Sequence, residues 1–226
     1  MVKEYNTRHH QMKGHIAMLV RDCMTRNPIS VHRESDPLAA IALCKSARIR
    51  RLPVINAEGH IVGIVSRNDL ELFLSKAPSP GIMKRQHNIE QVMVTSVFTV
   101  SPDLPTEEAA RLMVERKIGS LPVVEDGKLV GIITETDIFK QFVDILGGRA
   151  DALRLTVMVR DVPGQMAKVL SAIAAAGGNL RSVVLHNPTP TGFVYATLWV
   201  QNLERDTLTA AIQAQTDVQL IRVWSK

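Results

Sequence analysis

The 226-residue sequence has only two cysteines and few aromatic residues, and both shortages exclude classes of protein. Cys23 and Cys44 lie in mainly apolar segments and not at a metal-binding spacing. We therefore predict two reduced thiols rather than a disulfide or a metal site. Aromatic residues make up 4% of the chain, which argues against a stacking surface for single-stranded nucleic acid. The core is expected to be aliphatic.

Long apolar runs are missing as well. No run approaches the roughly 18–20 residues that cross a bilayer, and the N-terminus lacks the apolar core of a signal peptide. We therefore expect a cytoplasmic protein that has no membrane partner. The net charge is +5, and the basic residues are scattered apart from Arg48, Arg50, Arg51 and a basic N-terminal stretch. A nucleic-acid surface is normally denser, so the charge argues against such a partner.

The sequence also lacks a persuasive catalytic set. The histidines outside the N-terminal stretch fall in unrelated elements, and there is no Cys-x-x-Cys pair, zinc-type histidine cluster or Walker loop. Asp103, Glu107 and Glu108 are typical of the start of a helix rather than of a catalytic carboxylate pair. We therefore predict that the protein is not an enzyme and requires no metal or cofactor.

The main feature that is present is an internal repeat. Residues 63–69 (Gly-Ile-Val-Ser-Arg-Asn-Asp) return as residues 131–137 (Gly-Ile-Ile-Thr-Glu-Thr-Asp), an offset of 68. Residues 52–55 return as residues 121–124, an offset of 69. The offset changes from 69 to 68 because the second copy has one residue fewer in the turn between the two motifs, and turns tolerate changes in length. Two copies in register indicate one structural unit used twice.

Each copy predicts a strand, a helix, a hairpin and a final helix. In the first copy we expect a strand over residues 28–31 and a helix that begins at Pro37 and is capped by Ser35 or Asp36. The final helix is capped by Ser66 or Asn68 and runs through Leu74. The apolar face of the earlier helix is approximated by Leu38, Ile41, Ala42 and Ile49.

The pattern of the sequence changes after the second repeat. The last segment has the pattern βαββαβ, a split βαβ unit with both helices on one face of an antiparallel sheet. The other face needs cover, and we expect a second copy of the chain to supply it. The predicted boundaries are a flexible extension 1–17, a first repeat 18–77, a linker 78–88, a second repeat 89–146, a linker 147–152 and a third domain 153–226.

Each repeat resembles a CBS domain, through its Leu-Pro-Val hairpin and the following motif that ends in Ser or Thr, two residues and Asp. Two such repeats in tandem resemble the paired unit called a Bateman module. Residues 161–164 (Asp-Val-Pro-Gly) before a helix and 177–180 (Gly-Gly-Asn-Leu) after it resemble an ACT domain. The order CBS–CBS–ACT is similar to bacterial regulators of the acetoin utilisation protein B type.

The resemblance implies a fold of mixed α+β and α/β class. Two CBS repeats would pack with pseudo-two-fold symmetry, followed by a ferredoxin-like βαββαβ ACT domain. It also implies that an adenine nucleotide or related adenosyl ligand binds in clefts between the repeats.

The residues make physical sense of that ligand. Asp69 and Asp137 can accept hydrogen bonds from ribose hydroxyls. Ser66 and Thr134 stand beside helix N-terminal amides, where a phosphate is favoured. The same residues are also typical of ordinary helix caps, whose interaction with the helix dipole stabilises by about 0.3–1 kcal/mol, so folding alone can explain them. Ile64 and Ile132 are assigned to the apolar wall for the base, and Pro53 and Pro122 to contacts with the base edge. The cations are assigned to Arg50, Arg51 and Arg67.

The two copies differ in charge. Arg48, Arg50, Arg51 and Arg67 of the first repeat correspond to Lys117, Gly119, Ser120 and Glu135 of the second. Because phosphates bind cations, we predict that any polyphosphate is held better by the cleft rich in these arginines. A solvated arginine cluster or salt bridges in a dimer is the alternative.

The ACT resemblance implies a small effector, frequently an amino acid, bound at a subunit interface. Gly164 would let helix amides approach a ligand carboxylate, and Asp161 would receive an amino group. A plain helix start in a domain that only dimerises is the alternative. The positions of this sequence that match the effector-binding positions of ACT domains are Asp161, Val162, Gly164, Gln165, Asn179 and Leu180.

We therefore predict a homodimeric, non-catalytic regulator that acts on a protein the sequence does not identify. It would bind an adenosyl ligand of the AMP, ADP or ATP type between its CBS repeats and use its ACT domain for dimerisation and amino-acid sensing. The alternative is a ligand-free assembly scaffold or partner-binding module, linked to acetoin metabolism. A nucleic-acid-binding regulator and an accessory enzyme of acetoin breakdown are weaker rivals.

Overall fold

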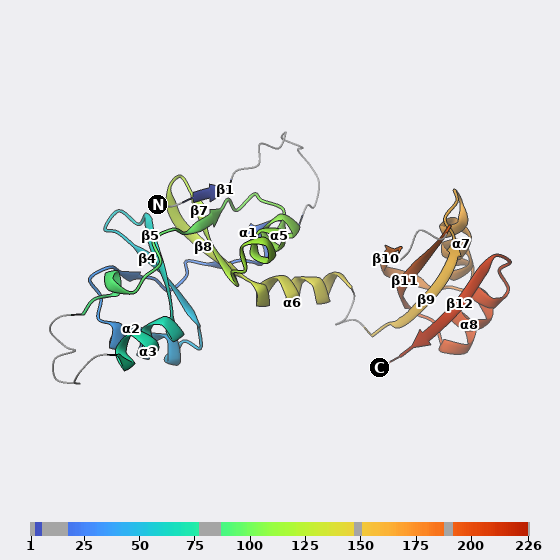
Figure 1. Cartoon of the computed structure of the whole chain (residues 1–226). Coiled ribbons are helices and arrows are strands. Elements are labelled where there is room, and N and C mark those ends of the chain that lie inside the picture. Colours follow the sequence, from blue (N-terminus) through green and yellow to red (C-terminus); the bar gives the residue numbers. More distant parts are fainter. Residues whose placement is uncertain (1–2, 6–17, 77–86, 147–150, 188–191, 226) are drawn as a thin grey trace. The chain divides into compact units, whose positions relative to one another are not determined.

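The computed structural model describes residues 3–5, 18–76, 87–146, 151–187 and 192–225. The chain divides into two compact units, Met1–Ile138 and Phe139–Lys226, which are considered separately (Figure 1). The linker residues 78–86 and 147–150 that the sequence predicts lie outside the described residues. Among the described helices, none combines the length and the apolar character needed to span a membrane.

The first repeat forms a three-stranded sheet with two helices packed beside it (Figure 1). The sheet order is β3-β4-β5, in which β3 is parallel and β5 antiparallel to β4. The elements are α1 (Val20–Cys23), β2 (Thr25–Arg26), β3 (Val31–His32), α2 (Pro37–Ser46), β4 (Arg51–Ile55), β5 (Ile61–Ser66) and α3 (Arg67–Ser75).

The second repeat has the same order of elements and a larger sheet, β1-β6-β7-β8-β2. Residues 3–5, predicted to be part of a flexible extension, form β1 (Lys3–Tyr5), which pairs in parallel with β6. That part of the prediction is wrong, because a partner strand far along the chain fixes the segment. The other elements are η1 (Ile89–Gln91), β6 (Phe98–Val100), α5 (Thr106–Arg116), β7 (Ser120–Glu125), β8 (Lys128–Thr134) and α6 (Glu135–Ile145).

The start of α2 is confirmed, and its predicted apolar face is right at Ile41 and wrong at Leu38 and Ala42. The Asp36 carboxylate caps the helix by accepting a hydrogen bond from the backbone N–H of Leu38 at 2.9 Å. Leu38 is 40% exposed and Ala42 is exposed. With Ile41, the buried residues of the helix are Pro37, Ala40 and Cys44, spaced as one helical face. Most positions of α2 are apolar, so periodicity does not single out the face that packs.

The predicted strand over residues 28–31 is also shorter than expected. Only Val31 of that range lies in a strand, β3.

The two repeats exchange short segments, which fixes their packing within the first unit. Strand β2, which precedes the first sheet, pairs with Gly131 and Ile132 of β8 in the second repeat. Val94, which precedes the second sheet, bridges to Ile64 of β5 in the first repeat. The exchange is therefore reciprocal, as a two-fold relation between the copies requires.

Two methionines occupy the space that glycines leave at these crossings. A Cβ atom on Gly63 would lie 2.6 Å from the sulfur of Met93. A Cβ atom on Gly131 would overlap the sulfur of Met24 in the corresponding way. A larger residue at either position would force the methionine of the other repeat to move.

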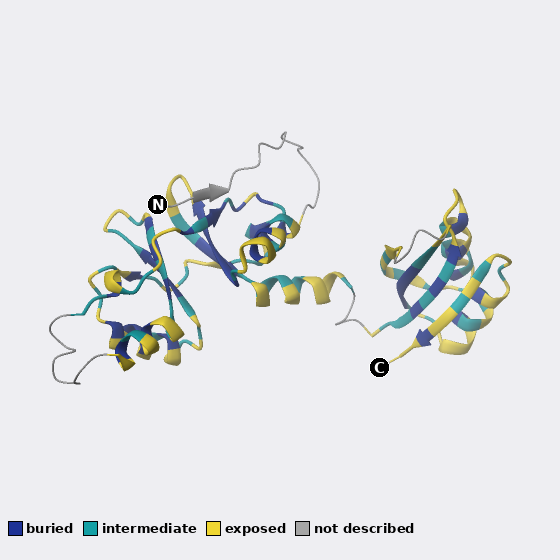
Figure 2. Ribbon diagram, viewed as in Figure 1, coloured by how far each residue is buried: buried dark blue, intermediate teal, exposed yellow. Residues whose placement is uncertain are grey.

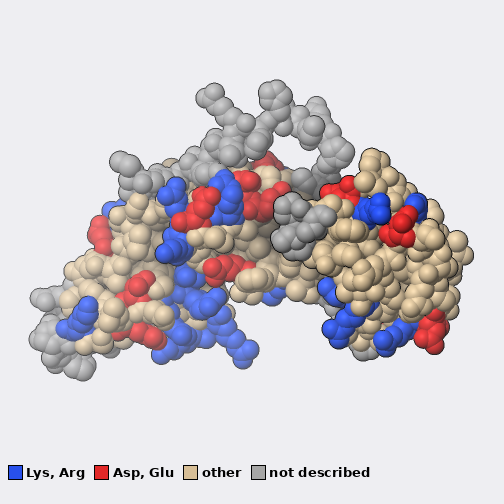
Figure 3. All heavy atoms as spheres, turned by 45° about the vertical axis from the view of Figure 1, so that its right-hand side comes forward, with Lys and Arg blue, Asp and Glu red and all other residues tan. Residues whose placement is uncertain are grey.

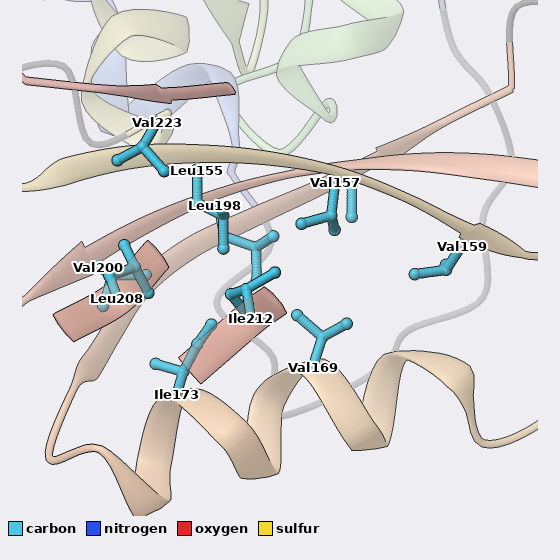
Figure 4. Packing of buried hydrophobic residues seen from close by; sticks show 11 residues of the cluster. Leu155, Val157, Val159, Val169, Ile173, Leu198, Val200, Leu208, Ile212 and Val223 are labelled. Atoms are coloured by element: carbon cyan, nitrogen blue, oxygen red, sulfur yellow. The ribbon is translucent and has the colours of Figure 1, made fainter. Parts of the chain in front are cut away.

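The C-terminal unit has the predicted βαββαβ order, and its sheet order is β10-β11-β9-β12 with every pair antiparallel. Side chains of β9 and β11 face both helices from one side of the sheet (Figure 4). The prediction that both helices cover one face is therefore confirmed. The elements are β9 (Leu153–Arg160), α7 (Gln165–Ala175), β10 (Asn179–His186), β11 (Phe193–Gln201), α8 (Arg205–Gln213) and β12 (Val218–Trp224).

Each repeat and the C-terminal unit has its own aliphatic core, as the low aromatic content predicts (Figure 2). Leu52 and Val54 lie in the first core, and Leu121 and Val123 hold the corresponding positions in the second. Cys44 is buried in the first core and Cys23 is half-buried against the second. Cys23 and Cys44 are both free cysteines in the described part of the chain.

Candidate functional site

The repeated Ser/Thr and Asp residues build the same capping box twice. Ser66 caps α3: its Oγ accepts a hydrogen bond from the backbone N–H of Asp69 at 3.1 Å. In return, Asp69 Oδ2 accepts from the backbone N–H of Ser66 at 3.3 Å and from its hydroxyl at 2.5 Å. Thr134 and Asp137 form the matching bonds at 3.3, 3.0 and 2.6 Å. The capping role is therefore real, and it uses Oδ2 of each carboxylate while Oδ1 takes no part in the box.

A cavity of ≈ 210 Å³ lies between the repeats, beside the first capping box. Its walls come from β4, β5 and the start of α3 in the first repeat. The second repeat supplies the segment that leads into β6, the residues that follow α5, and β7. Both repeats thus contact the same space.

The structure brings together five of the eleven residues that the sequence assigns to a nucleotide. Arg51, Ile64, Ser66, Asp69 and Pro122 all line this cavity. The register explains the grouping, since Arg51 pairs with Ser66 across the β4–β5 hairpin. Alternate residues of a strand share a face, so Ile64 and Ser66 face the cavity together.

The counterparts of Ile64, Ser66 and Asp69 in the second repeat do not line this cavity. Thr134 and Asp137 hold the position equivalent to Ser66 and Asp69 at the end of β8 and the start of α6. Ile132 pairs with Pro122, as Ile64 pairs with Pro53.

Most of the arginine cluster points elsewhere. Arg67 Nε lies 3.7 Å from the Glu71 carboxylate, one turn further along α3. Arg50 is exposed, and its carbonyl accepts a hydrogen bond from the Arg67 backbone N–H at 2.9 Å. Arg48 is exposed as well. Of this cluster, Arg51 is the member that lines the cavity.

Sequence reasoning missed three polar residues of the cavity, Ser96, Lys117 and Ser120. Ser120 is 5% exposed, and its Oγ has no hydrogen-bond partner in the described part of the chain. An unpaired buried hydroxyl typically costs about 1–3 kcal/mol. The offset of 69 places Ser120 opposite Arg51. That correspondence is the signal that would have found it.

The residues predicted to bind an effector in the C-terminal unit fall at the start of α7 and of β10. Gly164 precedes α7 with φ +87°, which favours glycine, and no side chain caps the helix. Gln165 is 8% exposed, and its Oε1 is buried without a partner among the described residues. Asp161 and Val162 are exposed.

The other two predicted residues, Asn179 and Leu180, begin β10 and pair with Gln201 and Val200. Two larger hollows of ≈ 450 and ≈ 390 Å³ lie on this unit, along β12 with α8 and beside residues 151–153. Neither is lined by any of the six predicted effector residues. These two hollows therefore do not support the predicted effector site, although they are larger than the cavity between the repeats.

The ionisable groups of the described chain give no sign of a metal centre. Within the described ranges, no group of three or more His, Cys, Asp or Glu residues is placed to hold a metal ion. Burial raises the pKa of the Cys23 and Cys44 thiols, so both favour the protonated form. Basic and acidic side chains lie next to one another on the face shown in Figure 3.

The duplicated hairpins, the exchanged segments and the paired capping boxes define a tandem CBS module. The family model of the CBS domain matches residues 20–76 and 89–144, which make up half of the chain. The chain therefore belongs to the CBS domain family.

The chain is similar to several known proteins. Uncharacterized protein MJ1426 of Methanocaldococcus jannaschii is 30% identical over 155 residues, which cover 56% of this chain and 92% of that protein. A putative acetoin utilization protein from Vibrio cholerae is 33% identical, with a TM-score of 0.53 over 59% of this chain and 96% of that one. CBSX2, solved in complex with AMP, is 32% identical, with a TM-score of 0.49 over 56% of this chain and 97% of that one.

Proposed function

We propose that the CBS pair is a non-catalytic sensor that binds an adenosyl ligand, of the AMP, ADP or ATP type, between its repeats. The observation that carries this proposal is the cavity lined by both repeats, with the capping box of Ser66 and Asp69 in its wall. The CBS resemblance supplies the class of ligand, and the residues supply the chemistry.

The lining residues fit the parts of such a ligand. Asp69 Oδ1 takes no part in the capping box, so it is available to accept hydrogen bonds from ribose hydroxyls. Ile64 and Pro122 come from different repeats and offer apolar surface to a base. The N-terminus of α3 and Arg51 favour an anionic group.

A ligand in this position would act by a population shift. Because the cavity is lined by both repeats, its shape depends on how they are packed. A ligand biases that packing only by its differential affinity for the arrangements. A partner protein that recognises one arrangement would thereby be regulated.

We further propose that the C-terminal unit is an ACT domain that forms a homodimer and senses an amino acid. The βαββαβ order and the left-handed Gly164 before α7 support this proposal. At the same helix start, Gln165 Oε1 has no partner within the described ranges and is a polar group that a ligand would satisfy.

The double substitution of Asp69→Ala and Asp137→Ala tests the sensor. We expect calorimetry to show at least a ten-fold loss of affinity for AMP, ATP and adenosine, because the ribose loses a charged acceptor. Asp36→Ala is the matched control, since it removes a helix cap of about 1 kcal/mol away from the cavity.

The Asp36→Ala control should bind AMP, ATP and adenosine with the affinity of the wild type. Unchanged affinity in a folded double variant would overturn the proposal. A wild-type protein that binds no adenosyl compound would favour the ligand-free scaffold instead.

A further inference from the structure

The sheet of the C-terminal unit has a second face, opposite α7 and α8, and aromatic rings gather on it. Buried side chains of β9 and β11 face the helices (Figure 4), so the residues that alternate with them face the other way. Arg154 of β9 lies on this second face and pairs with Trp199 of β11 and Trp224 of β12. Phe193 and Tyr195 lie on the same side of β11 as Trp199. Both tryptophans of the chain, one of its two tyrosines and one of its five phenylalanines are therefore on one face.

The same sheet carries positive charge without acidic partners. Its four strands contain no Asp or Glu residue. Within the described ranges, none of their arginines forms an ion pair. These arginines are Arg154, Arg160, Arg181 and Arg222. Because nothing in the sheet neutralises them, they attract an anionic partner.

Arg154 is held in position on this face. Its guanidinium carbon lies 5.5 Å from the centroid of the Trp199 ring, and its Nη1 donates a hydrogen bond to the Thr156 hydroxyl at 3.3 Å. Trp199 is 9% exposed, so its ring supports the guanidinium rather than a ligand. The rings of Trp224 and Phe193 are 42% and 37% exposed, and these are the ones that a ligand can reach.

Two hollows lie beside Trp224, the most exposed of these rings. Their volumes are ≈ 450 and ≈ 310 Å³, and both are lined by Trp224 and Arg222. Arg154 completes the smaller one, while Arg205 and Ser225 also line the larger one. An exposed ring and unpaired guanidinium groups therefore face the same space.

This combination of groups fits one kind of partner. Proteins that bind single-stranded nucleic acid stack its bases on aromatic side chains and hold its phosphates with cations. Four-stranded sheets do so in RNA-binding proteins, through aromatic side chains on their open face. A second copy of the chain, which the sequence predicts as the cover, would set arginines against arginines, and like charges repel.

We infer that this face of the C-terminal unit binds single-stranded nucleic acid. Bases stack on Trp224 and Phe193, while Arg154 and Arg222 contact phosphates. The low aromatic content of the chain argues against such a surface, but composition does not show that the fold gathers the rings in one place. The proposed homodimer would then use another surface, and the adenosyl cleft is a separate site.

Fluorescence titration of the full-length protein tests the inference. The probes are a short fluorescein-labelled oligouridine, an oligothymidine of the same length and a duplex of that length. Both single strands should bind, with affinities that fall as salt is added, and the duplex should bind at least ten-fold more weakly. Tryptophan emission should be quenched on binding, because both tryptophans of the chain lie on this face.

Variants locate the binding surface. Trp224→Ala should lower the affinity for both single strands by about ten-fold through the loss of one stacked base, whereas Trp224→Phe keeps a ring and should stay within about three-fold of the wild type. Arg222→Ala should weaken binding and reduce the salt slope by about 0.7, the contribution of one phosphate. Phe139→Ala and Arg48→Ala remove exposed side chains elsewhere and should change neither affinity.

Three outcomes would overturn the inference. The wild type would bind neither single strand at low salt; the duplex would compete as well as a single strand while tryptophan emission stays unchanged; or Trp224→Ala and Arg222→Ala would leave the oligonucleotide affinities unaltered. If those two variants instead dissociate a dimer in sedimentation experiments, the face is an interface between copies of the chain. None of these results bears on the adenosyl ligand.

Discussion

At the scale of single residues, the capping boxes show how one carboxylate can serve folding and binding together. Asp69 uses Oδ2 to cap α3 and still lines the cavity. Because the two roles involve different oxygens, the helix cap and the predicted ribose contact do not exclude each other. A Ser-x-x-Asp spacing is enough for the cap, since both residues lie within one turn.

The two cysteines provide a prediction about pH. Burial raises the pKa of the Cys44 and Cys23 thiols above the ordinary value. The protonated thiols therefore contribute to the free energy of unfolding. This contribution is complete below the unfolded-state pKa of about 8.5 and is lost as pH rises through the higher folded-state pKa. We expect the free energy of unfolding to fall above about pH 8.5, as measured by urea denaturation.

A variant with Cys23→Ala and Cys44→Ala should lose the part of this slope that comes from the thiols. Identical slopes in the two proteins would contradict the assignment. The buried Cys44 of the native protein should also react with iodoacetamide far more slowly than the thiol of the unfolded chain.

At the scale of elements, the crossing of β2 onto β8 holds the repeats together. Met24 immediately precedes β2 and occupies the space beside Gly131 of β8. Met93 and Gly63 repeat the arrangement on the other side. Met24 and Met93 are 69 residues apart, the same offset as the Leu-Pro-Val motifs, and this shared packing role explains the repeated methionine.

Gly131→Ala tests this crossing. The new Cβ would overlap the Met24 sulfur, so we expect a destabilisation of about 1–3 kcal/mol from overpacking, measured by urea denaturation. In a double-mutant cycle with Met24→Ala, the cost of Gly131→Ala should be much smaller because the clash is gone. Strict additivity of the two substitutions would show that the contact does not matter.

At the scale of the whole molecule, the chain consists of two units with separate cores. Separate cores allow separate unfolding. We therefore expect two transitions in a calorimetric scan, because each unit loses its own packing cooperatively.

The two transitions should respond to different ligands. Saturating AMP should raise the midpoint of one, since a ligand at 100 times its Kd stabilises the native state by about 2.7 kcal/mol. An amino-acid effector, found by screening a panel of amino acids, should raise the midpoint of the other transition. A single transition that both ligands shift would contradict the independent units.

Much of the architecture was predictable because it depends on local signals. The hairpins follow from strand-forming residues around a turn, and the starts of α2 and α3 follow from Asp36 and Ser66. The βαββαβ order of the last domain follows from its hydrophobic pattern and its glycines. The apolar face of α2 was not predictable, because most of its positions are apolar.

The candidate site was predictable only in part. The motif identified Ser66 and Asp69, but Arg50 and Arg67 do not line the cavity although Arg51 does. Ser120 and Lys117 were missed because nothing in their local sequence marks them. They matter only because the second repeat packs against the first.

The sequence by itself determined the duplication, the capped helices and the aliphatic cores, because turns, caps and periodicity act between residues close in the chain. Only the tertiary structure decided which side chains share the cavity, and that β1 and β2 join the second sheet. Arg51 and Ser120 are 69 residues apart. Their meeting depends on how two folded surfaces pack, and that packing is the sum of many contacts rather than the property of one segment.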